Sequence, residues 1–254
     1  MKKRGQITIF IVLGIIVIIS TILLLIFSSN KSVPGVETSP LKTESVKLFV
    51  DSCLKKTVQA GVIKIGENGG YYHFNENISN FHLKPYYFYE NQTIVPPLEL
   101  IENELESYVK NRLPYCTNWF KSFPQFDVKI NPINVKAEIL PTQIIVNLNY
   151  PLEISQNDKI SMISEFEYKL DCRLGTTHQF LIDYFNEWQI KSPEGIVLSP
   201  FDKFSEDGFY YYFVDTYAPD FTFILVDNEV EVNNLPFYYE FALRYQLEEV
   251  EPWE

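Results

Sequence analysis

The three cysteines are the side chains whose chemistry the sequence defines best. Cys53 falls on the apolar face of a helix predicted over residues 41–65, and Cys116 follows a second predicted helix that opens at Pro97. A disulfide between them would join the two helices across a loop of about 60 residues, worth about 3–4 kcal/mol in the chain-entropy model. The alternative is two buried free thiols, and three cysteines allow three pairings. We favour the Cys53–Cys116 disulfide, and we expect Cys172, which alternates with inward-facing strand residues, to lie in the core.

The other residues with potential chemistry do not form a known catalytic or metal motif. His73, His82 and His178 lack the HxH or HExxH spacing of a metal site. The sequence also lacks a D-x-D-x-D-G calcium loop, a G-x-S-x-G nucleophile motif and the glycine loops that cradle phosphates. We therefore expect no metal, no cofactor and no catalytic residues, and we interpret the chain as a protein that is not an enzyme.

Three N-x-S/T sequons occur, at Asn30, Asn77 and Asn91. Asn77 and Asn91 lie in predicted loops, so they are the candidates for glycosylation in an external domain. The alternative is chance, because an asparagine-rich chain produces a few such triplets.

Aromatic residues are abundant, with 17 Tyr and 20 Phe, and they cluster at residues 71–74, 86–89 and 209–213. Exposed rings could stack on sugars or on a partner protein, and Tyr72, Tyr87 and Tyr89 are the candidates for such a surface. The alternative interpretation is core packing, because half of the rings in an alternating strand must point inward.

The first part of the chain predicts a membrane anchor. Residues 7–27 form an uncharged, predominantly apolar run of 21 residues, which spans roughly 30 Å as a helix. A basic segment at residues 1–6 precedes it, so the N-terminus is expected in the cytoplasm and the remainder outside the cell. The alternative is a cleaved secretory signal, which has a shorter apolar core. The formal net charge of −12 argues against nucleic acid as the main partner.

The segment Lys3-Arg4-Gly5-Gln6-Ile7-Thr8-Ile9-Phe10 resembles an archaeal class III signal peptide of the type IV pilin-like kind. This resemblance implies cleavage between Gly5 and Gln6, with the apolar helix kept on the mature protein. Phe10 stands where that family often places a glutamate that helps subunits assemble.

Further motifs resemble an uncharacterised group of membrane-anchored archaeal surface proteins that share this basic-Gly-Gln opening and have no established activity. These motifs are Cys53-Leu54-Lys55, Gly69-Gly70-Tyr71, Leu113-Pro114-Tyr115-Cys116 and Val146-Asn147-Leu148-Asn149-Tyr150-Pro151.

Hydrophobic spacing outlines the elements that hold these residues. After a stalk at residues 28–40, the helical spacing of residues 41–65 is followed by short aromatic strands at 71–74 and 84–89 and by the helix that opens at Pro97, which Leu113-Pro114 should end. Glutamates, among them Glu102, Glu104 and Glu106, fill the polar face of that helix.

The second half of the chain is predicted to be richer in strands. Period-two alternation predicts an antiparallel meander between residues 126 and 173, and helical spacing returns over residues 176–188. Strands follow to residue 245, with a hairpin turn at Asp227-Asn228. The fold class is α+β: one transmembrane helix, then helices packed on an antiparallel sheet, with residues 41–190 as the ectodomain and residues 191–254 as a β-rich portion of the same or a second domain.

Three functions remain open at this point. The first is a non-catalytic, single-pass cell-envelope protein that interacts with other envelope proteins or glycans; a pilin-like subunit that self-associates through its N-terminal helix is one version. The second is a membrane-tethered module that binds a small ligand or a glycan. The third is an envelope hydrolase.

Overall fold

A computed structural model describes residues 43–73, 79–192, 195–215 and 219–245. The described residues belong to one compact unit, which spans residues 41–254. The predicted membrane span at 7–27, the stalk, Gly5, Gln6 and Asn77 lie outside the described residues. Within the described ranges, no helix is both long enough and apolar enough to cross a lipid bilayer.

The first sheet is built around one long central strand, β5 (Gln143–Gln156). Strand β6 (Lys159–Asp171) pairs antiparallel with one edge of β5, and β3 (Asp127–Ile130) and β4 (Asn134–Ile139) pair antiparallel with its other edge. The predicted alternation is confirmed: the side chains that face the helices are buried, among them Val135, Ala137, Ile139, Ile144, Val146 and Leu148.

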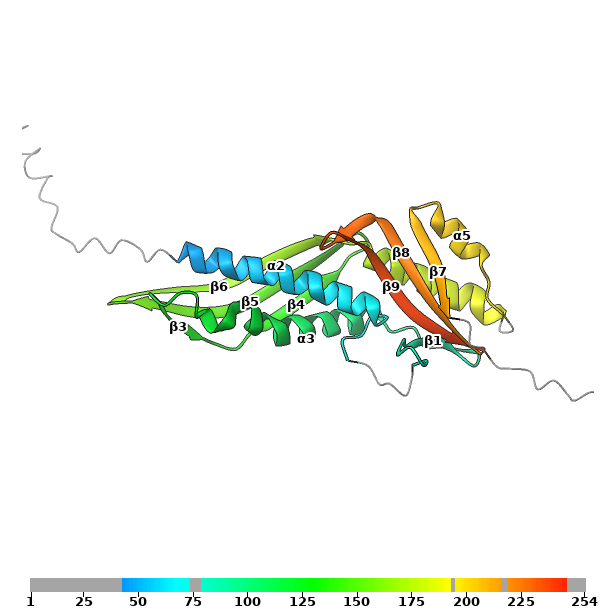
Figure 1. The fold of residues 1–254 in the computed structure, drawn as a ribbon, viewed down its shortest axis with the longest axis horizontal. Helices are drawn as coiled ribbons and strands as arrows, with labels where there is room; N and C mark the ends of the chain where they lie inside the picture. The colour runs from blue at the N-terminus through cyan, green and yellow to red at the C-terminus, as the bar shows by residue number, and fades with distance from the viewer. Residues whose placement is uncertain (1–42, 74–78, 193–194, 216–218, 246–254) are drawn as a thin grey trace, which may run out of the picture. The chain divides into compact units, whose positions relative to one another are not determined.

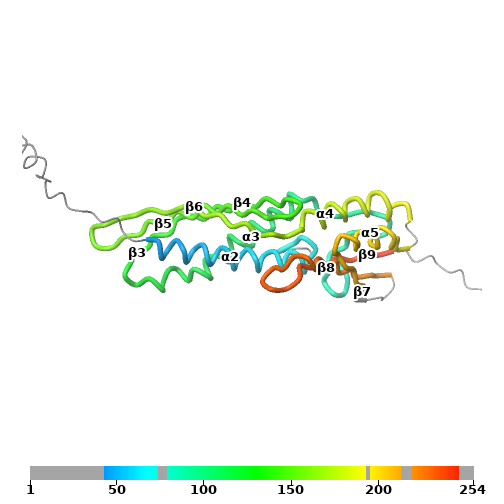
Figure 2. The backbone as a smooth tube through the Cα atoms, turned by 90° about the horizontal axis from the view of Figure 1, so that it is seen from above, coloured from blue at the N-terminus to red at the C-terminus, as the bar shows by residue number. Residues whose placement is uncertain are grey.

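Two helices cover the inner face of this sheet (Figures 1 and 2). Helix α2 (Glu44–Glu67) contacts β6, and α3 (Leu98–Thr117) contacts α2 and β4. The two helices approach closely at Gly61, where an added Cβ would lie 2.8 Å from the ring of Tyr108. Helix α2 ends where Gly69 and Gly70 adopt φ angles of +53° and +89°, a conformation that side chains other than glycine disfavour.

The second sheet has the order β2-β1-β9-β8-β7 and is mixed. Strand β1 (Tyr86–Tyr89) pairs antiparallel with β2 (Gln92–Thr93) and parallel with β9 (Leu235–Arg244), which corrects the prediction of a purely antiparallel sheet. Strands β8 (Asp220–Val232) and β7 (Phe209–Asp215) complete it. The C-terminal strands therefore share a sheet with residues 86–93, and the sequence between them contributes the first sheet.

Aromatic rings join the remaining helices to the second sheet. Helix α4 (Leu174–Asp183) continues into a π-helical turn (Tyr184–Trp188) and a 3₁₀ turn (Gln189–Lys191), and α5 (Ser199–Ser205) follows. The ring centroid of Phe185 lies 5.8 Å from that of Phe241 in β9. The ring centroid of Phe201 in α5 lies 5.4 Å from that of Phe223 in β8. Many aromatic residues thus form the core, which explains much of the high aromatic content.

Three local predictions were wrong. Residues 71–73 form no strand, because they lie against the side of α3, where Glu104 accepts hydrogen bonds from two of their N–H groups. Helix α3 passes through Pro114 and ends at Thr117, since a proline in the last helical turn disrupts only one hydrogen bond near the end. Asp227 lies within β8 and not in a turn; the two-residue hairpin turn is Asn233-Asn234, both with positive φ.

Candidate functional site

A disulfide joins α2 to α3. Cys53 and Cys116, the pair favoured on sequence grounds, are bonded with their Cα atoms 5.6 Å apart and 63 residues apart in the chain. Cys172 is a free thiol, fully buried, and burial raises its pKa to about 12. The chain therefore has one crosslink close to its first described residues and one thiol that is shielded from solvent.

The glutamates of α3 bind backbone groups instead of forming a purely solvated face. Glu102 accepts a hydrogen bond from the Ile139 N–H at 2.8 Å, and Glu106 accepts one from the Ala137 N–H at 3.0 Å. Both N–H groups belong to β4 and point away from β5. The two carboxylates therefore satisfy the free edge of β4, an edge that would otherwise be open to pairing with another chain.

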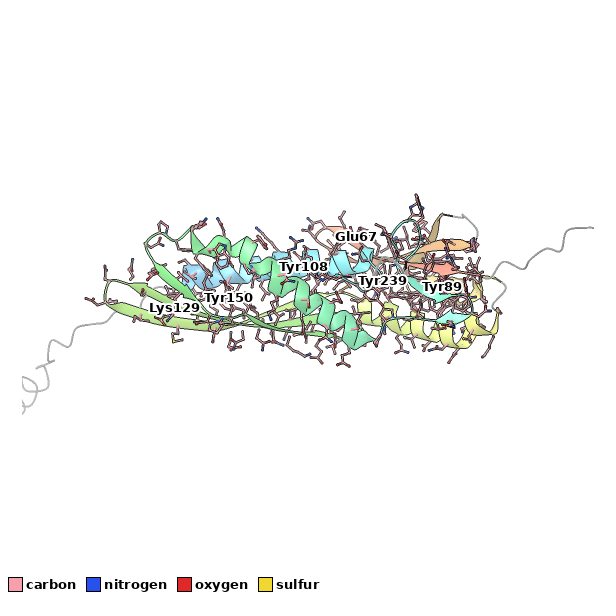
Figure 3. The ribbon with its side chains drawn as sticks, turned by 90° about the horizontal axis from the view of Figure 1, so that it is seen from below. Glu67, Tyr89, Tyr108, Lys129, Tyr150 and Tyr239 are labelled. Atoms are coloured by element: carbon pink, nitrogen blue, oxygen red, sulfur yellow. A yellow bond between two sulfur atoms is a disulfide. The ribbon has the colours of Figure 1, made fainter. Side chains whose placement is uncertain are left out.

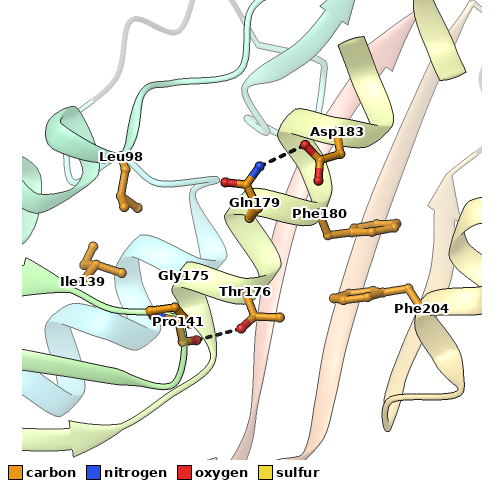
Figure 4. A pocket seen from close by; sticks show the side chains of 9 residues that line it. All are labelled: Leu98, Ile139, Pro141, Gly175, Thr176, Gln179, Phe180, Asp183 and Phe204. Carbon is orange, nitrogen blue, oxygen red and sulfur yellow. Dashed lines mark hydrogen bonds between the residues drawn. The ribbon is translucent and has the colours of Figure 1, made fainter. Parts of the chain in front are cut away.

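A cleft lies where the start of α4 meets the turn between β4 and β5 (Figure 4). Gly175 makes this approach feasible, because an added Cβ would overlap the carbonyl of Leu140. Thr176 Oγ1 donates a hydrogen bond to the Pro141 carbonyl at 2.9 Å. The cavity measures about 460 Å³ and is lined by Leu98, Ile139, Pro141, Gly175, Thr176, Gln179, Phe180, Asp183 and Phe204.

The cleft combines an apolar wall with a polar rim. Phe180 of α4 and Phe204 of α5 lie parallel with their ring centroids 4.0 Å apart and point toward one another in Figure 4. Gln179 Nε2 donates a hydrogen bond to Asp183 Oδ1 at 2.9 Å on the exposed side of α4. Asp183 Oδ2 and the Gln179 carbonyl oxygen can accept further hydrogen bonds, so the rim is able to bind a hydroxyl or amide group that lies over the apolar wall.

A second hollow lies on the other side of the same two rings. It measures about 360 Å³ and is lined by Phe180, Glu187, Trp188, Pro200, Lys203, Phe204 and Asp207. Trp188 is 49% exposed, in contrast to the buried rings around it. The two hollows bring apolar rings, carboxylates and a lysine together at the surface of α4 and α5.

The structure removes Tyr87 from the predicted aromatic surface and leaves Tyr72 and Tyr89 partly exposed. Tyr87 is fully buried, and its hydroxyl lies 2.6 Å from that of Tyr239 and donates to or accepts from it within the core. Tyr72 is half-buried with its ring 4.9 Å from that of Tyr108, and Tyr89 is half-buried with its ring 5.1 Å from that of Tyr86. Tyr72 thus packs on α3, whereas Tyr87 and Tyr89 belong to β1, which lies between β2 and β9 in the second sheet.

The other candidates from the sequence occupy separate places. Asn91 is exposed at the β1–β2 turn, so a glycan attached to it would extend into solvent. His178 is buried in α4, its Nε2–H donates to the Pro96 carbonyl at 2.8 Å, and burial lowers its pKa. No group of three or more His, Cys, Asp or Glu side chains among the described residues could hold a metal ion.

The cleft carries no sequence signal that could have revealed it. Phe180 and Phe204 are 24 residues apart, and α5 is too short for periodicity to identify. Only the packing of α4 and α5 against the second sheet brings the two rings together. Comparison of the chain with protein-family models, with curated proteins and with solved structures finds no significant match.

Proposed function

We propose that this chain is a membrane-anchored protein whose folded unit lies outside the cytoplasm and acts as a non-catalytic interaction protein of the cell envelope. The observation that carries the proposal is the Cys53–Cys116 disulfide. Structural disulfides persist in oxidising compartments and are rare in the cytosol. The apolar run at residues 7–27, with basic residues before it, supports the same orientation.

Protease protection in intact cells tests this orientation. Protease added to intact cells that express the full chain should remove the folded unit while a cytoplasmic marker protein stays intact. On a non-reducing gel, the chain with Cys172→Ala should migrate faster than after reduction, because only the Cys53–Cys116 crosslink remains. Digestion of the folded unit only after cell lysis, together with equal migration of the chain with and without reductant, would contradict the proposal.

A pilin-like subunit is one version of this function, supported by the basic-Gly-Gln opening. In this version a peptidase removes residues 1–5 and the apolar helix packs with copies of itself. Intact mass of the chain extracted from membranes tests it: a mass that lacks Met1 to Gly5 supports the version, and a full-length N-terminus rejects it while leaving the anchored protein in place.

A second candidate function is the binding of a small polyhydroxylated ligand, such as a sugar ring, in the cleft of α4. The cavity of about 460 Å³ is large enough for a monosaccharide or disaccharide. Its apolar wall at Leu98, Ile139 and Phe180 would contact C–H groups, and Asp183 and Gln179 would accept or donate hydrogen bonds to hydroxyls.

Ligand-observed NMR tests this second candidate. Saturation transfer from the protein to methyl glycosides of glucose, galactose, mannose and N-acetylglucosamine would detect weak binding. We expect Asp183→Ala to abolish the transfer and Asp158→Ala, an exposed aspartate at the β5–β6 turn, to leave it unchanged. Equal transfer to both variants would show that the sugar contacts the protein elsewhere.

A further inference from the structure

One end of the folded unit collects the start of α2, the end of α3, β3 and the β5–β6 hairpin (Figures 1 and 2). The disulfide holds the first half of α2 against the end of α3. The ring centroid of Phe49 in α2 lies 6.3 Å from that of Phe120 and 5.3 Å from that of Phe123. Strand β3 pairs with the part of β5 next to the hairpin turn. We refer to residues 43–56, 110–129 and 152–162 as the basic end.

Large apolar side chains are exposed on the basic end from each of its three segments. The exposed fractions are Leu48 59%, Tyr115 77%, Trp119 64%, Ile160 66% and Met162 67%. The pairing of β5 with β6 explains the exposure of Ile160 and Met162. A register shift between Asn149 and Leu152 places both side chains on the outer face of the sheet. Farther along β6 that outer face carries Glu165, Glu167 and Lys169.

Trp119 is held outward by an unusual stretch of backbone. Asn118, Trp119 and Phe120 have φ angles of 44°, 53° and 57°, three consecutive residues in the left-handed region. This conformation costs roughly 1–2 kcal/mol for each residue that is not glycine. The left-handed stretch turns Phe120 into the core, where its ring centroid lies 6.1 Å from that of Tyr150, and it leaves the indole of Trp119 in solvent. Strain of this kind persists where surrounding structure enforces it and is concentrated at functional sites.

The charge of the basic end is opposite to that of the rest of the chain. Its segments contain eight Lys or Arg and five Asp or Glu, whereas the whole chain has a formal charge of −12. Figure 3 places Lys129 at this end and Tyr89 at the other. The segment 183–215 also exposes aromatic residues, among them Trp188, but it contains seven acidic and two basic residues. Of these two surfaces, the basic end is therefore the one that combines exposed apolar groups with a positive balance.

The chain also reaches the basic end directly from the apolar run. Fifteen residues, 28–42, separate that run from Thr43, and they can extend over at most roughly 50 Å. A bilayer that holds residues 7–27 is therefore within reach of the basic end. Indole and tyrosine rings are enriched at membrane–water interfaces, and lysines near the surface are attracted by anionic lipid headgroups.

We propose that the basic end lies on the anionic headgroup layer of the bilayer that holds the anchor, with Trp119, Ile160 and Met162 inserted into the interface. This inference rests on the proposed membrane anchor. It gives the folded unit a defined orientation, in which the cleft of α4 and the acidic surface around α5 point away from the membrane, toward envelope partners.

Quenching of tryptophan emission by brominated lipid tests the proposal on the full chain. The chain is reconstituted into vesicles of phosphatidylcholine and phosphatidylglycerol at about 4:1, in which the phosphatidylcholine carries bromine near the top of the acyl chain. A variant with Trp188→Phe and Trp253→Phe reports on Trp119 alone, and the matched control with Trp119→Phe and Trp253→Phe reports on Trp188. We expect Trp119 to lose about half of its emission and Trp188 to lose almost none.

A second pair of variants tests the contribution of the hairpin. In the background that reports on Trp119, Ile160→Ser with Met162→Ser should reduce the quenching, because both side chains are exposed and their loss leaves the core intact. Tyr210→Ser with Tyr212→Ser removes two exposed rings from β7 and should leave the quenching unchanged. Near-ultraviolet circular dichroism confirms that each variant is folded.

The outcomes separate this inference from the membrane anchor. Failure of the full chain to float with the vesicles in a sucrose gradient would reject the anchor. Flotation with Trp119 quenched no more than Trp188 would overturn the inference and leave the anchor in place. Shielding of Trp119 from a soluble quencher by lipid-free envelope proteins but not by vesicles would also overturn it, because it would identify a protein as the occupant.

Discussion

Arg173, directly before α4, forms a bidentate ion pair with Asp227 of β8, whose side chain is 1% exposed. The Arg173 guanidinium also lies 4.1 Å from the centroid of the Phe209 ring and donates to the Asp207 carbonyl at 2.9 Å. This contact links the end of the first sheet to two strands of the second sheet. The acidic partner lowers the energy of the charged guanidinium, so the pKa of Arg173 is raised, chiefly by its hydrogen bonds to Asp227.

Replacement of Arg173 should destabilise the folded unit strongly. Arg173→Ala leaves the Asp227 carboxylate buried, with the Glu229 N–H at 3.0 Å as a remaining donor. An unpaired buried charge of this kind typically costs about 3–5 kcal/mol. Urea unfolding followed by circular dichroism measures the difference in the free energy of unfolding.

Glu229→Ala is the matched control for this prediction. Glu229 also pairs with Arg173, at 3.1 Å, but its side chain is 64% exposed, so we expect a loss of no more than about 1 kcal/mol. Similar losses for Arg173→Ala and Glu229→Ala would contradict a central role for the buried pair.

Asp227 also shows which parts of the fold could be predicted from sequence. Residues such as Val46, Val50 and Leu54 in α2 repeat with the period of their own element, so local spacing was enough to predict the helix and, likewise, the meander of β4 to β6. The Asp227-Asn228 pair is typical of a turn, and local sequence does not reveal the partner of Asp227, because Arg173 is 54 residues away in the chain. The cleft was missed for the same reason, since its rings meet only after α4 and α5 have packed on the second sheet.

The edge of β4 should depend on the carboxylates of α3. Glu102→Ala leaves the N–H of Ile139, a residue 4% exposed, without its acceptor, which costs about 1–3 kcal/mol. Glu102→Gln keeps an acceptor oxygen at the same place and should recover most of that loss. Urea unfolding of the two variants measures the difference in the free energy of unfolding.

Aggregation is the second readout for this edge. Glu102→Ala combined with Glu106→Ala exposes two N–H groups of β4, so we expect faster aggregation on heating, measured by light scattering. Glu99→Ala removes an exposed glutamate from the same helix as the control. Aggregation of the control at the rate of the double variant would show that net charge, and not the strand edge, is responsible.

His178 should make stability depend on pH. Burial lowers its pKa in the folded state, and its hydrogen bond to the Pro96 carbonyl opposes this only in part. As the pH falls through the usual histidine pKa of about 6.5, the unfolded chain therefore binds a proton before the folded chain does. The stability associated with the neutral imidazole is fully present above that pH and is lost toward the lower folded-state pKa.

Comparison of the wild type with His178→Gln isolates this contribution. Gln can donate to the Pro96 carbonyl but does not titrate, so its free energy of unfolding should fall less steeply between pH 7 and pH 5. A single proton changes the slope by at most about 1.4 kcal/mol per pH unit. His73→Gln removes an exposed imidazole as the control. Parallel pH profiles for the wild type and His178→Gln would refute the prediction.

The disulfide should be the main source of sensitivity to reductant. It closes a loop with a sequence separation of 63 residues, for which the chain-entropy model gives about 4 kcal/mol. We expect reductant to lower the midpoint of thermal unfolding in the wild type and in Cys172→Ala by the same amount, and to leave Cys53→Ala with Cys116→Ala unchanged.

Cys172 is buried and its pKa is raised to about 12, so a maleimide should not label the native unreduced chain. A reductant effect that persists in the double variant would show that the crosslink is not the source of the sensitivity, and labelling of Cys172 in the native state would contradict its burial.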